Sequence, residues 1–278
     1  MRIGFISDFF QDNLLGGAEL NDGVLIDHLS TKYEVVKISS TQCTPESLHR
    51  LDFVILSNFV GLSDQSKSHL VDNTPYILYE HDHKYVVNRD PSKFKDFTIP
   101  KEYLINQEVY SSARRVVCLS SSQTDTIRKN LNIENLHNIS CSLWSEDRLS
   151  LLRQFGCNEK SDKFAIMDSK NPIKNTAKAE SFCRKNDIKY DLIRDSNPVR
   201  FLEMLSGYKG LVFFPGVLES LSRISVEAKM MGCKLLTTPR MLGASYEDWF
   251  KLSGPELIEV MERNVSSALS KFEEIIEE

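Results

Sequence analysis

The sequence predicts an α/β protein made of two doubly wound parallel-sheet domains, and three observations predict it. Short apolar runs alternate with helix-length amphipathic segments along the whole chain. Apolar and polar residues do not alternate within these runs, which is typical of strands buried on both faces of a parallel sheet. The pattern pauses once, at the polar stretch 156–162, and then restarts. We therefore expect two sheets in succession, with helices joining their parallel strands by right-handed crossovers.

Six strands and four helices are expected in the first domain, which we place at residues 1–156. The expected strands cover residues 2–7, 34–38, 53–56, 76–79, 115–119 and 138–143. The expected helices cover residues 19–29, 45–51, 101–112 and 123–131. Thr44 marks the start of the second helix, because it is a capping residue followed by proline at the first helical position.

The same pattern predicts a second domain over residues 157–253, with the polar stretch 156–162 as a linker. The expected strands cover residues 164–167, 190–193, 211–214 and 234–237, and the expected helices cover 175–186, 198–205 and 223–231. The last segment, 254–278, predicts one long amphipathic helix, because Leu257, Met261 and Val265 recur with helical spacing. Two domains and a final helix make up the expected architecture.

The composition argues against several classes of protein. Of the 278 residues, 41% are hydrophobic and 26% are charged, which is ordinary for a globular protein and excludes a disordered chain. The net charge of −5 argues against a nucleic-acid binder held by bulk positive charge. The six cysteines are too far apart for a CxxC redox pair or a zinc ribbon. No stretch approaches the roughly 18 apolar residues of a membrane span. We expect a reduced, cytoplasmic protein.

Candidate site residues follow the strands, because ligands of such sheets bind outside the carboxyl ends of the strands. Gly16-Gly17-Ala18-Glu19 comes after the first strand and opens a helix. Glycines let the backbone approach a ligand, and a helix N-terminus favours an anion. Taken alone, the motif is better interpreted as a flexible turn with an acidic first-turn residue. The absence of GxGxxG weakens an NAD-dependent interpretation.

The loop after the fourth strand reads Glu80-His81-Asp82-His83. It allows a ligand-contacting histidine oriented by a carboxylate, a metal site, or a plain polar loop. The metal interpretation is disfavoured because no further His or Cys lies nearby in sequence. The following segment, 84–101, is rich in Lys and Arg, and we interpret it as a solvated loop rather than a contact with an anionic membrane.

Two loops of the second domain suit phosphate and sugar recognition. Lys170 and Lys174 lie four residues apart at a strand-to-helix turn, which suits a diphosphate, although ordinary solvated lysines have the same spacing. Glu219 precedes the helix 223–231 and Glu227 lies inside it, and carboxylates can accept the paired hydroxyls of a ribose or sugar. The alternative is a capping acid and a surface glutamate. An ionised group in a mostly covered helix, however, needs a partner.

Taken together and in this order, these loops resemble the family 4 glycosyltransferases, which are retaining enzymes of the GT-B fold. The resemblance covers nearly the whole chain. It rests on Gly16 and Gly17 with Glu19, on His81 and Asp82, on a strand ending in Ser120, on Lys170 and Lys174, and on the E-x7-E motif from Glu219 to Glu227.

The resemblance implies a role for each of these positions. Two residues would be catalytic: His81, which contacts the donor sugar, and Glu219, which meets the transferred sugar. Glu227 would hold the ribose hydroxyls of the donor. The residues that would line the phosphates are Gly16, Gly17, Lys170 and Lys174, together with the amides of Ser220, Leu221, Ser222 and Arg223. No cofactor and no obligatory metal are implied, because cations and helix amides stabilise the leaving diphosphate.

The function implied is transfer of a sugar from a nucleotide-diphosphate sugar to an acceptor that is a saccharide, a lipid-linked molecule or a small molecule. The implied fold has two Rossmann-like domains facing a cleft, with the helix 254–278 crossing back to the first. Two alternatives stay open: a nucleotide-sugar epimerase of the same fold, and a nucleotide- or sugar-binding protein without turnover.

The sequence departs from the family pattern in three ways. The chain is short, with one strand–helix unit fewer than usual between Lys174 and Pro215. Ser222 and Asn175 stand where glycine is common in the family.

Overall fold

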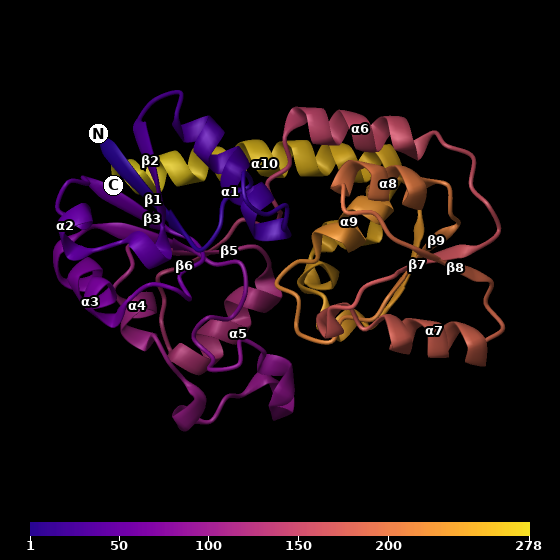
Figure 1. The fold of residues 1–278 in the computed structure, drawn as a ribbon, viewed down its shortest axis with the longest axis horizontal. Coiled ribbons are helices and arrows are strands. Elements are labelled where there is room, and N and C mark those ends of the chain that lie inside the picture. The colour runs from indigo at the N-terminus through magenta and orange to yellow at the C-terminus, as the bar shows by residue number, and fades with distance from the viewer. The chain divides into compact units, whose positions relative to one another are not determined.

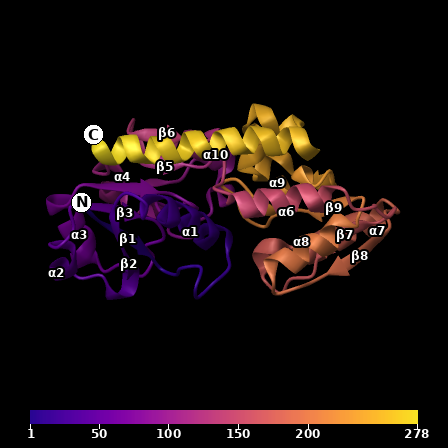
Figure 2. The ribbon, with the colours of Figure 1, turned by 90° about the horizontal axis from the view of Figure 1, so that it is seen from above.

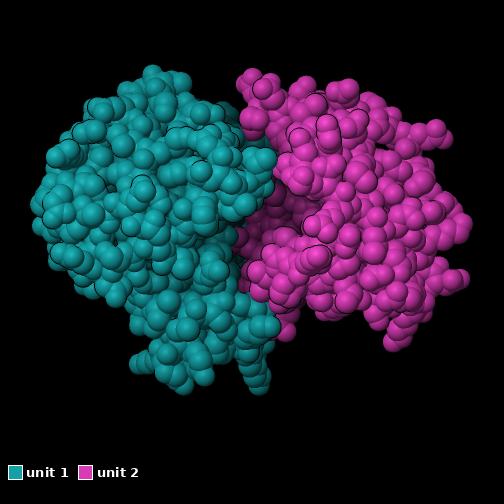
Figure 3. Space-filling model, in the orientation of Figure 1, with its two compact units in different colours: residues 1–144, 264–278 teal, residues 145–263 magenta.

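The computed structural model describes residues 1–278 and separates them into two compact units (Figure 1). Unit 1 comprises Met1–Trp144 and Asn264–Glu278, and unit 2 comprises Ser145–Arg263 (Figure 3). The chain returns to unit 1 within a single helix, α10 (Gly254–Glu277). This agrees with the predicted final helix that crosses back to the first domain. No helix combines the length and the apolar composition that a membrane span requires.

Unit 1 contains a six-stranded sheet in which every neighbouring pair is parallel, as predicted. In spatial order the strands are β2 (Glu34–Ser39), β1 (Arg2–Ser7), β3 (Phe53–Leu56), β4 (Tyr76–Tyr79), β5 (Val116–Cys118) and β6 (Leu136–Asn138). The central strands β3 and β4 are apolar and buried throughout, because helices cover both faces of the sheet. The strand order reverses between β1 and β3.

The helices of unit 1 are α1 (Gly17–Leu29), α2 (Pro45–Leu48), α3 (Asp64–Asn73), α4 (Gln107–Ser111) and α5 (Ser121–Leu131). Thr44 caps α2 by accepting a hydrogen bond from the backbone of Ser47, as its position before proline predicts. The C-terminal half of α10 runs along unit 1 (Figure 2). There Arg114 donates to the carbonyl oxygen of Ile275 at 2.8 Å, and the ring of Phe272 packs against Tyr79.

Unit 2 contains a four-stranded parallel sheet, and all four strands were predicted. In spatial order they are β10 (Lys234–Thr237), β9 (Gly210–Phe213), β7 (Phe164–Met167) and β8 (Tyr190–Ile193). The helices are α6 (Glu146–Gly156), α7 (Thr176–Lys185), α8 (Pro198–Ser206) and α9 (Arg223–Met230), with residues 254–263 of α10. The strand order reverses between β7 and β9, so the loops after these two strands diverge from the same edge of the sheet.

Two predicted elements differ from the structure. The strand expected at 138–143 shares only Asn138 with β6, which covers residues 136–138. The chain leaves the sheet after Asn138, because the Asn138 side chain accepts the backbone N–H of Ser140, and Ser140 has a positive φ. The helix expected at 101–112 is broken into a short 3-10 turn and α4. Leu104 pairs with Val86 in an isolated bridge, and Asn106 is left-handed, so no continuous helix can form there.

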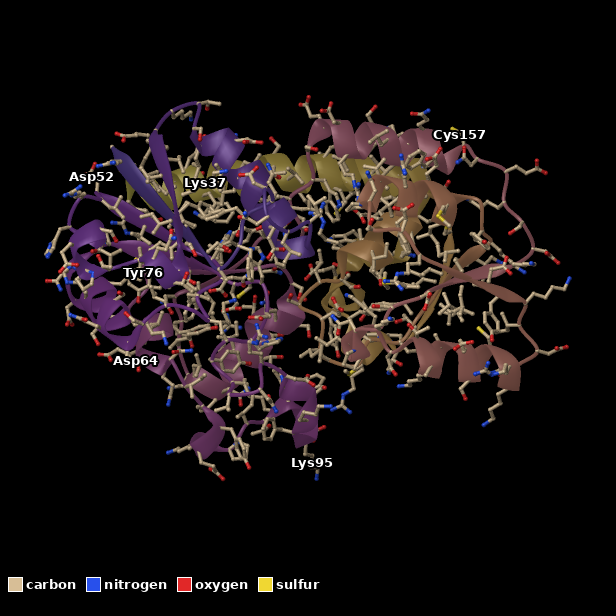
Figure 4. The ribbon with its side chains drawn as sticks, in the orientation of Figure 1. Lys37, Asp52, Asp64, Tyr76, Lys95 and Cys157 are labelled. Carbon is tan, nitrogen blue, oxygen red and sulfur yellow. The ribbon has the colours of Figure 1, made fainter.

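Two helices were not predicted. Helix α3 is polar, and only Ser66 and Leu70 of its residues are buried. Helix α6 is capped by Ser145 and buries Leu149, Leu152 and Phe155. The stretch 156–162, predicted to be a linker, lies within unit 2 between α6 and β7. All six cysteines are free, and the exposed one, Cys157, follows α6 (Figure 4).

Candidate functional site

In unit 1 the loops after β1 and β3 are joined at the point where the strand order reverses. The carboxylate of Asp8, which follows β1, accepts the backbone N–H groups of Val60 at 3.1 Å and Gly61 at 2.9 Å. It also accepts the hydroxyl of Ser40, which follows β2. One carboxylate therefore holds the ends of three strands, and the segment 9–16 starts from a fixed point.

A buried cluster around Asp22 holds His81. The imidazole Nε2 of His81 lies 2.8 Å from Asp22 Oδ1, and the hydroxyls of Ser7 and Ser57 donate to the same carboxylate. The side chains of His81 and Asp22 are 5% and 1% exposed. Because an ionised carboxylate only accepts hydrogen bonds, Nε2 carries the proton. A carboxylate orients His81, as one interpretation of the loop expected, but that carboxylate is Asp22 on α1 and not the adjacent Asp82.

Asp82 pairs with Lys84 in a second buried network. The ammonium of Lys84 lies 2.8 Å from Asp82 Oδ1, 2.7 Å from Glu80 Oε1 and 3.2 Å from Asn58 Oδ1. Burial alone would lower the pKa of Lys84, but the carboxylates of Asp82 and Glu80 raise it overall. Burial alone would raise the pKa of Asp82, but the ammonium of Lys84 outweighs burial and holds this pKa at about 2. The interpretation of 84–101 as a solvated loop is therefore wrong for Lys84, whose side chain is only 1% exposed.

The network around Lys84 fixes the loop that carries His81. The hydroxyl of Tyr110 on α4 donates to Glu80. The side-chain amide of Gln123 on α5 donates to the carbonyl oxygens of Glu80 and Asp82, at 3.1 and 3.0 Å. The loop is thus held by buried polar groups from two helices, which is why its backbone polar groups can lie inside the unit.

His83 lies apart from His81 and is wholly buried. Its ring packs edge-on against Tyr85, and neither ring nitrogen has a hydrogen-bond partner. Burial lowers the pKa of His83 to about 4, so the ring is neutral near pH 7. The structure gathers no group of three or more His, Cys, Asp or Glu side chains that could hold a metal ion.

Gly16 and Gly17 begin α1, with Gly16 as the N-cap residue. Glu19 folds its carboxylate back over Gly16, so that a Cβ atom at Gly16 would lie 2.3 Å from Glu19 Oε2. Burial raises the pKa of Glu19, while the backbone N–H groups of Glu19 and Gly16 favour its ionised form. An acidic residue at the third helical position commonly caps its own helix in this way. Glycine at position 16 therefore leaves room for the Glu19 carboxylate.

In unit 2 the two loops that diverge from β7 and β9 pack against each other. The backbone N–H of Gly216 donates to the carbonyl oxygen of Ile173 at 2.8 Å, and a Cβ atom at Gly216 would meet the carbonyl oxygen of Pro172 at 3.0 Å. The ammonium of Lys174 lies 3.4 Å from Glu219 Oε1. The structure thus brings together two predicted site residues that are 45 positions apart in the sequence. Lys170 is exposed on the same loop as Lys174.

The segment after β10 holds the backbone of Glu219 in place. The N–H of Glu219 donates to the carbonyl oxygen of Met241 at 3.0 Å, and the N–H of Gly243 donates back to the carbonyl oxygen of Glu219 at 2.8 Å. Ser220, Leu221, Ser222 and Arg223 then lead into α9, whose first residue is Arg223. Ser222 is its N-cap residue.

Ser222 and Asn175 both have positive φ angles, of 79° and 53°. These are the two positions where the family resemblance has glycine, which adopts positive φ freely. Asparagine tolerates this region better than most residues, whereas serine is strained in it. The chain therefore keeps the backbone shape that glycine favours, although it departs from glycine in sequence.

Glu227 is buried between two arginines. The Nε atom of Arg148 lies 3.1 Å from Glu227 Oε1, and a terminal nitrogen of Arg223 lies 3.7 Å from the same oxygen. The expectation that an ionised group in this helix needs a partner is met. Sequence reasoning missed Arg148, because it lies on α6, which was not predicted.

The predicted site residues therefore form two groups, one in each unit. Gly16, Gly17 and His81 lie in unit 1, and the other eight lie in unit 2. A separate cavity of about 320 Å³ lies in unit 2 along the outer strand β10. It is lined by Phe182, Phe214, Lys229, Leu235, Leu236, Thr237, Pro239 and Phe250, none of which is a predicted site residue.

No family model and no curated protein sequence matches this chain. Several solved structures resemble it. The lipopolysaccharide outer core galactosyltransferase WaaB, in its apo form, has a TM-score of 0.53 at 11% identity, over 97% of this chain and 91% of that one. A putative UDP-N-acetylglucosamine 2-epimerase from Listeria monocytogenes has a TM-score of 0.50 at 9% identity, over 99% and 89%. Anabaena Alr3699/HepE, in complex with UDP and glucose, has a TM-score of 0.47 at 14% identity, over 96% and 89%.

The first two similarities establish the class of fold. They extend over nearly the whole of this chain and most of each other chain, so both Rossmann-like units are matched. This chain has the GT-B fold, as the sequence predicted.

Proposed function

We propose that this protein is a retaining glycosyltransferase that moves a sugar from a nucleotide-diphosphate sugar to an acceptor. The observation that carries the proposal is the contact between Lys174 and Glu219. A cation suited to phosphate and a carboxylate suited to sugar hydroxyls meet where the strand order of unit 2 reverses, and ligands of doubly wound sheets bind at such a point.

The donor diphosphate is assigned to the two lysines and to the start of α9. The ammonium of Lys174 already lies near the carboxylate of Glu219. An incoming phosphate therefore meets a cation that is held in position, and it competes with Glu219 for that cation. The first amides of a helix lack intrahelical acceptors and carry the positive end of the helix dipole. The amides of residues 220–223 therefore suit the distal phosphate, and Glu227 suits the ribose.

The proposed chemistry needs no protein nucleophile. The bond between the sugar carbon and the diphosphate oxygen breaks, and the acceptor oxygen bonds to the same carbon from the same face. A donor phosphate oxygen takes the proton that the acceptor hydroxyl loses. Negative charge develops on the leaving diphosphate, and Lys170, Lys174 and the α9 amides stabilise it. His81, with Nε2 fixed by Asp22, is assigned to the transferred sugar. No metal takes part in this scheme.

A nucleotide-sugar epimerase is the second candidate, because a putative UDP-N-acetylglucosamine 2-epimerase shares the fold at a TM-score of 0.50. An epimerase consumes the nucleotide-sugar without an acceptor.

A thermal-shift screen against UDP-, GDP-, ADP- and dTDP-sugars tests the proposal, because a ligand of the native state raises the melting temperature. Donor consumption is then measured with and without candidate acceptors. A glycosyltransferase consumes the donor rapidly only with an acceptor, and an epimerase converts it alone. Binding without conversion identifies a binding protein, and no binding at all contradicts the proposal.

A further inference from the structure

Arg148 is a charged residue outside the predicted site whose partner is Glu227. It lies in the first turn of α6, and its Nε atom is 3.1 Å from Glu227 Oε1. The Arg148 side chain is 13% exposed and that of Glu227 is 4% exposed. Arg223 approaches the same oxygen at 3.7 Å, which is beyond hydrogen-bond distance. Arg148 therefore donates a hydrogen bond to this oxygen, and the charge of Arg223 lies nearby.

The contact with Arg148 sets the direction in which the Glu227 carboxylate faces. Arg223 and Glu227 lie on the same helix, α9, whereas Arg148 ties Glu227 to a different helix. The Nε–H of arginine points in one fixed direction in the guanidinium plane, so the hydrogen bond fixes the acceptor oxygen. A carboxylate has about four acceptor positions, so one bond from Arg148 does not exhaust its capacity.

We propose that Arg148 is a positioning residue for ribose recognition, which holds the ionised carboxylate of Glu227 in the orientation that accepts the ribose hydroxyls of a nucleoside diphosphate. This inference rests on the proposed function. Without Arg148 the buried carboxylate loses a hydrogen-bonded countercharge, and removing one partner of a buried ion pair is unfavourable. The carboxylate then turns away from this orientation and accepts the ribose hydroxyls less well.

The test measures recognition of the ribose hydroxyls and not merely binding. UDP, ADP and GDP, each beside its 2′,3′-dideoxy counterpart, are titrated into the wild-type protein and into Arg148→Ala and Arg148→Lys variants. We expect Arg148→Ala to weaken binding of the preferred ribonucleotide about tenfold or more, as the loss of a charge-assisted hydrogen bond predicts. Binding of the dideoxy counterpart should change by less than about twofold. Arg148→Lys, which keeps the charge, should restore part of the loss.

Two further variants separate positioning from other effects. Arg153→Ala is the matched control, because Arg153 is exposed on the same helix and pairs with the half-buried Glu262 at 2.7 Å. Its affinities should equal those of the wild type. The double variant Arg148→Ala/Glu227→Ala should bind the ribonucleotide as Glu227→Ala alone does, because Arg148 acts through Glu227. The double variant also removes both buried charges, so it remains informative if Arg148→Ala does not fold.

Two results would overturn the role of Arg148 and leave the proposed function standing. One is an Arg148→Ala protein that distinguishes ribo- from dideoxynucleotides as the wild type does. The other is a double variant that binds more weakly than Glu227→Ala, which would mean that Arg148 contacts the nucleotide itself. A wild-type protein that binds no nucleoside diphosphate overturns the proposed function, and this inference with it.

Discussion

Asp22 and His81 are 59 residues apart in the sequence, yet a 2.8 Å hydrogen bond joins the Asp22 carboxylate to the His81 imidazole inside unit 1. The carboxylate also accepts the hydroxyls of Ser7 and Ser57, so three donors converge on it. This arrangement fixes the plane of the imidazole and places the proton on Nε2. Any role of His81 toward a ligand therefore depends on Asp22.

Asp22→Asn should reduce turnover while leaving nucleotide binding nearly unchanged. The amide is similar in size to the carboxylate, but its NH2 group can donate a hydrogen bond where the carboxylate only accepts one, so His81 loses its fixed tautomer. The buried donors lose part of their acceptor, and we expect a loss of about 1–3 kcal/mol in unfolding free energy. Initial rates, nucleoside diphosphate titrations and denaturant unfolding measure these three effects. Asp27→Asn, an exposed change on the same helix, should have none of them. Unchanged turnover in Asp22→Asn would contradict a role for the pair.

Ser222→Gly should stabilise the protein. Ser222 has a φ of 79°, where a side chain is strained by roughly 1–2 kcal/mol and glycine is not. The substitution also removes the contact between the hydroxyls of Ser222 and Ser225, at 2.9 Å. Ser222→Ala removes the same contact but keeps the strain, so it is the control. Denaturant unfolding should find the glycine variant about 1 kcal/mol more stable than the alanine variant. Equal stabilities would mean that the left-handed conformation is unstrained here.

The fold was largely predictable, because strands buried on both faces of a parallel sheet consist of continuous runs of apolar residues. The runs at β3 and β4 contain four buried residues each, and both were predicted with their observed bounds. Helix α3 could not be found this way, because a mostly exposed helix needs few apolar residues. The end of β6 was also missed, since it depends on one side-chain hydrogen bond at Asn138.

The candidate site was predictable where it follows strands, and not where helices supply it. The loops of Lys174 and Glu219 extend from adjacent strands, so the topology alone brings them together. Asp22 and Arg148 reach their partners from helices, across 59 and 79 residues of sequence. Such pairings depend on how each helix is rotated against the sheet, and no local pattern in the sequence records that rotation.

The stability of the protein should fall between about pH 6.5 and pH 4, because His83 is buried without hydrogen-bond partners. Its folded pKa, about 4, lies below the ordinary value of 6.5, so the unfolded chain binds the proton more readily. The stability from a neutral His83 is therefore present above pH 6.5 and is lost as pH falls toward 4. The full effect is about 3 kcal/mol.

His83→Phe removes the titrating group and should flatten this part of the profile of unfolding free energy against pH. His49→Phe, at an exposed position, should leave the slope as it is in the wild type. A profile that keeps its slope in His83→Phe would show that other groups cause it.

Turnover should survive EDTA. The proposed scheme stabilises the leaving diphosphate with Lys170, Lys174 and the amides that begin α9, so a chelator removes nothing that the reaction needs. Donor consumption is measured before and after treatment with EDTA, with apyrase or another metal-dependent phosphatase as a positive control for chelation. Activity that disappears with EDTA and returns with Mn²⁺ or Mg²⁺ would contradict this scheme.

Lys174→Ala should weaken binding of a nucleoside diphosphate far more than binding of the nucleoside. The ammonium of Lys174 is fixed near the point where the loops after β7 and β9 diverge, 3.4 Å from Glu219 Oε1, and it is only partly exposed. A phosphate there gains a charge-assisted hydrogen bond, worth about 1.5–3 kcal/mol, that a nucleoside cannot make.

Added salt should also reduce the difference in affinity between the nucleoside diphosphate and the nucleoside in the wild type, because ions screen the attraction between Lys174 and the phosphate. Lys178→Ala is the matched control, because Lys178 lies four residues further on, in α7, where its ammonium is 5.8 Å from the centre of the Phe214 ring. Titration of UDP beside uridine, and of ADP and GDP beside their nucleosides, measures the contrast. If Lys174→Ala lowers the affinity for the nucleoside diphosphate and for the nucleoside equally, Lys174 does not bind the diphosphate and is only the structural partner of Glu219.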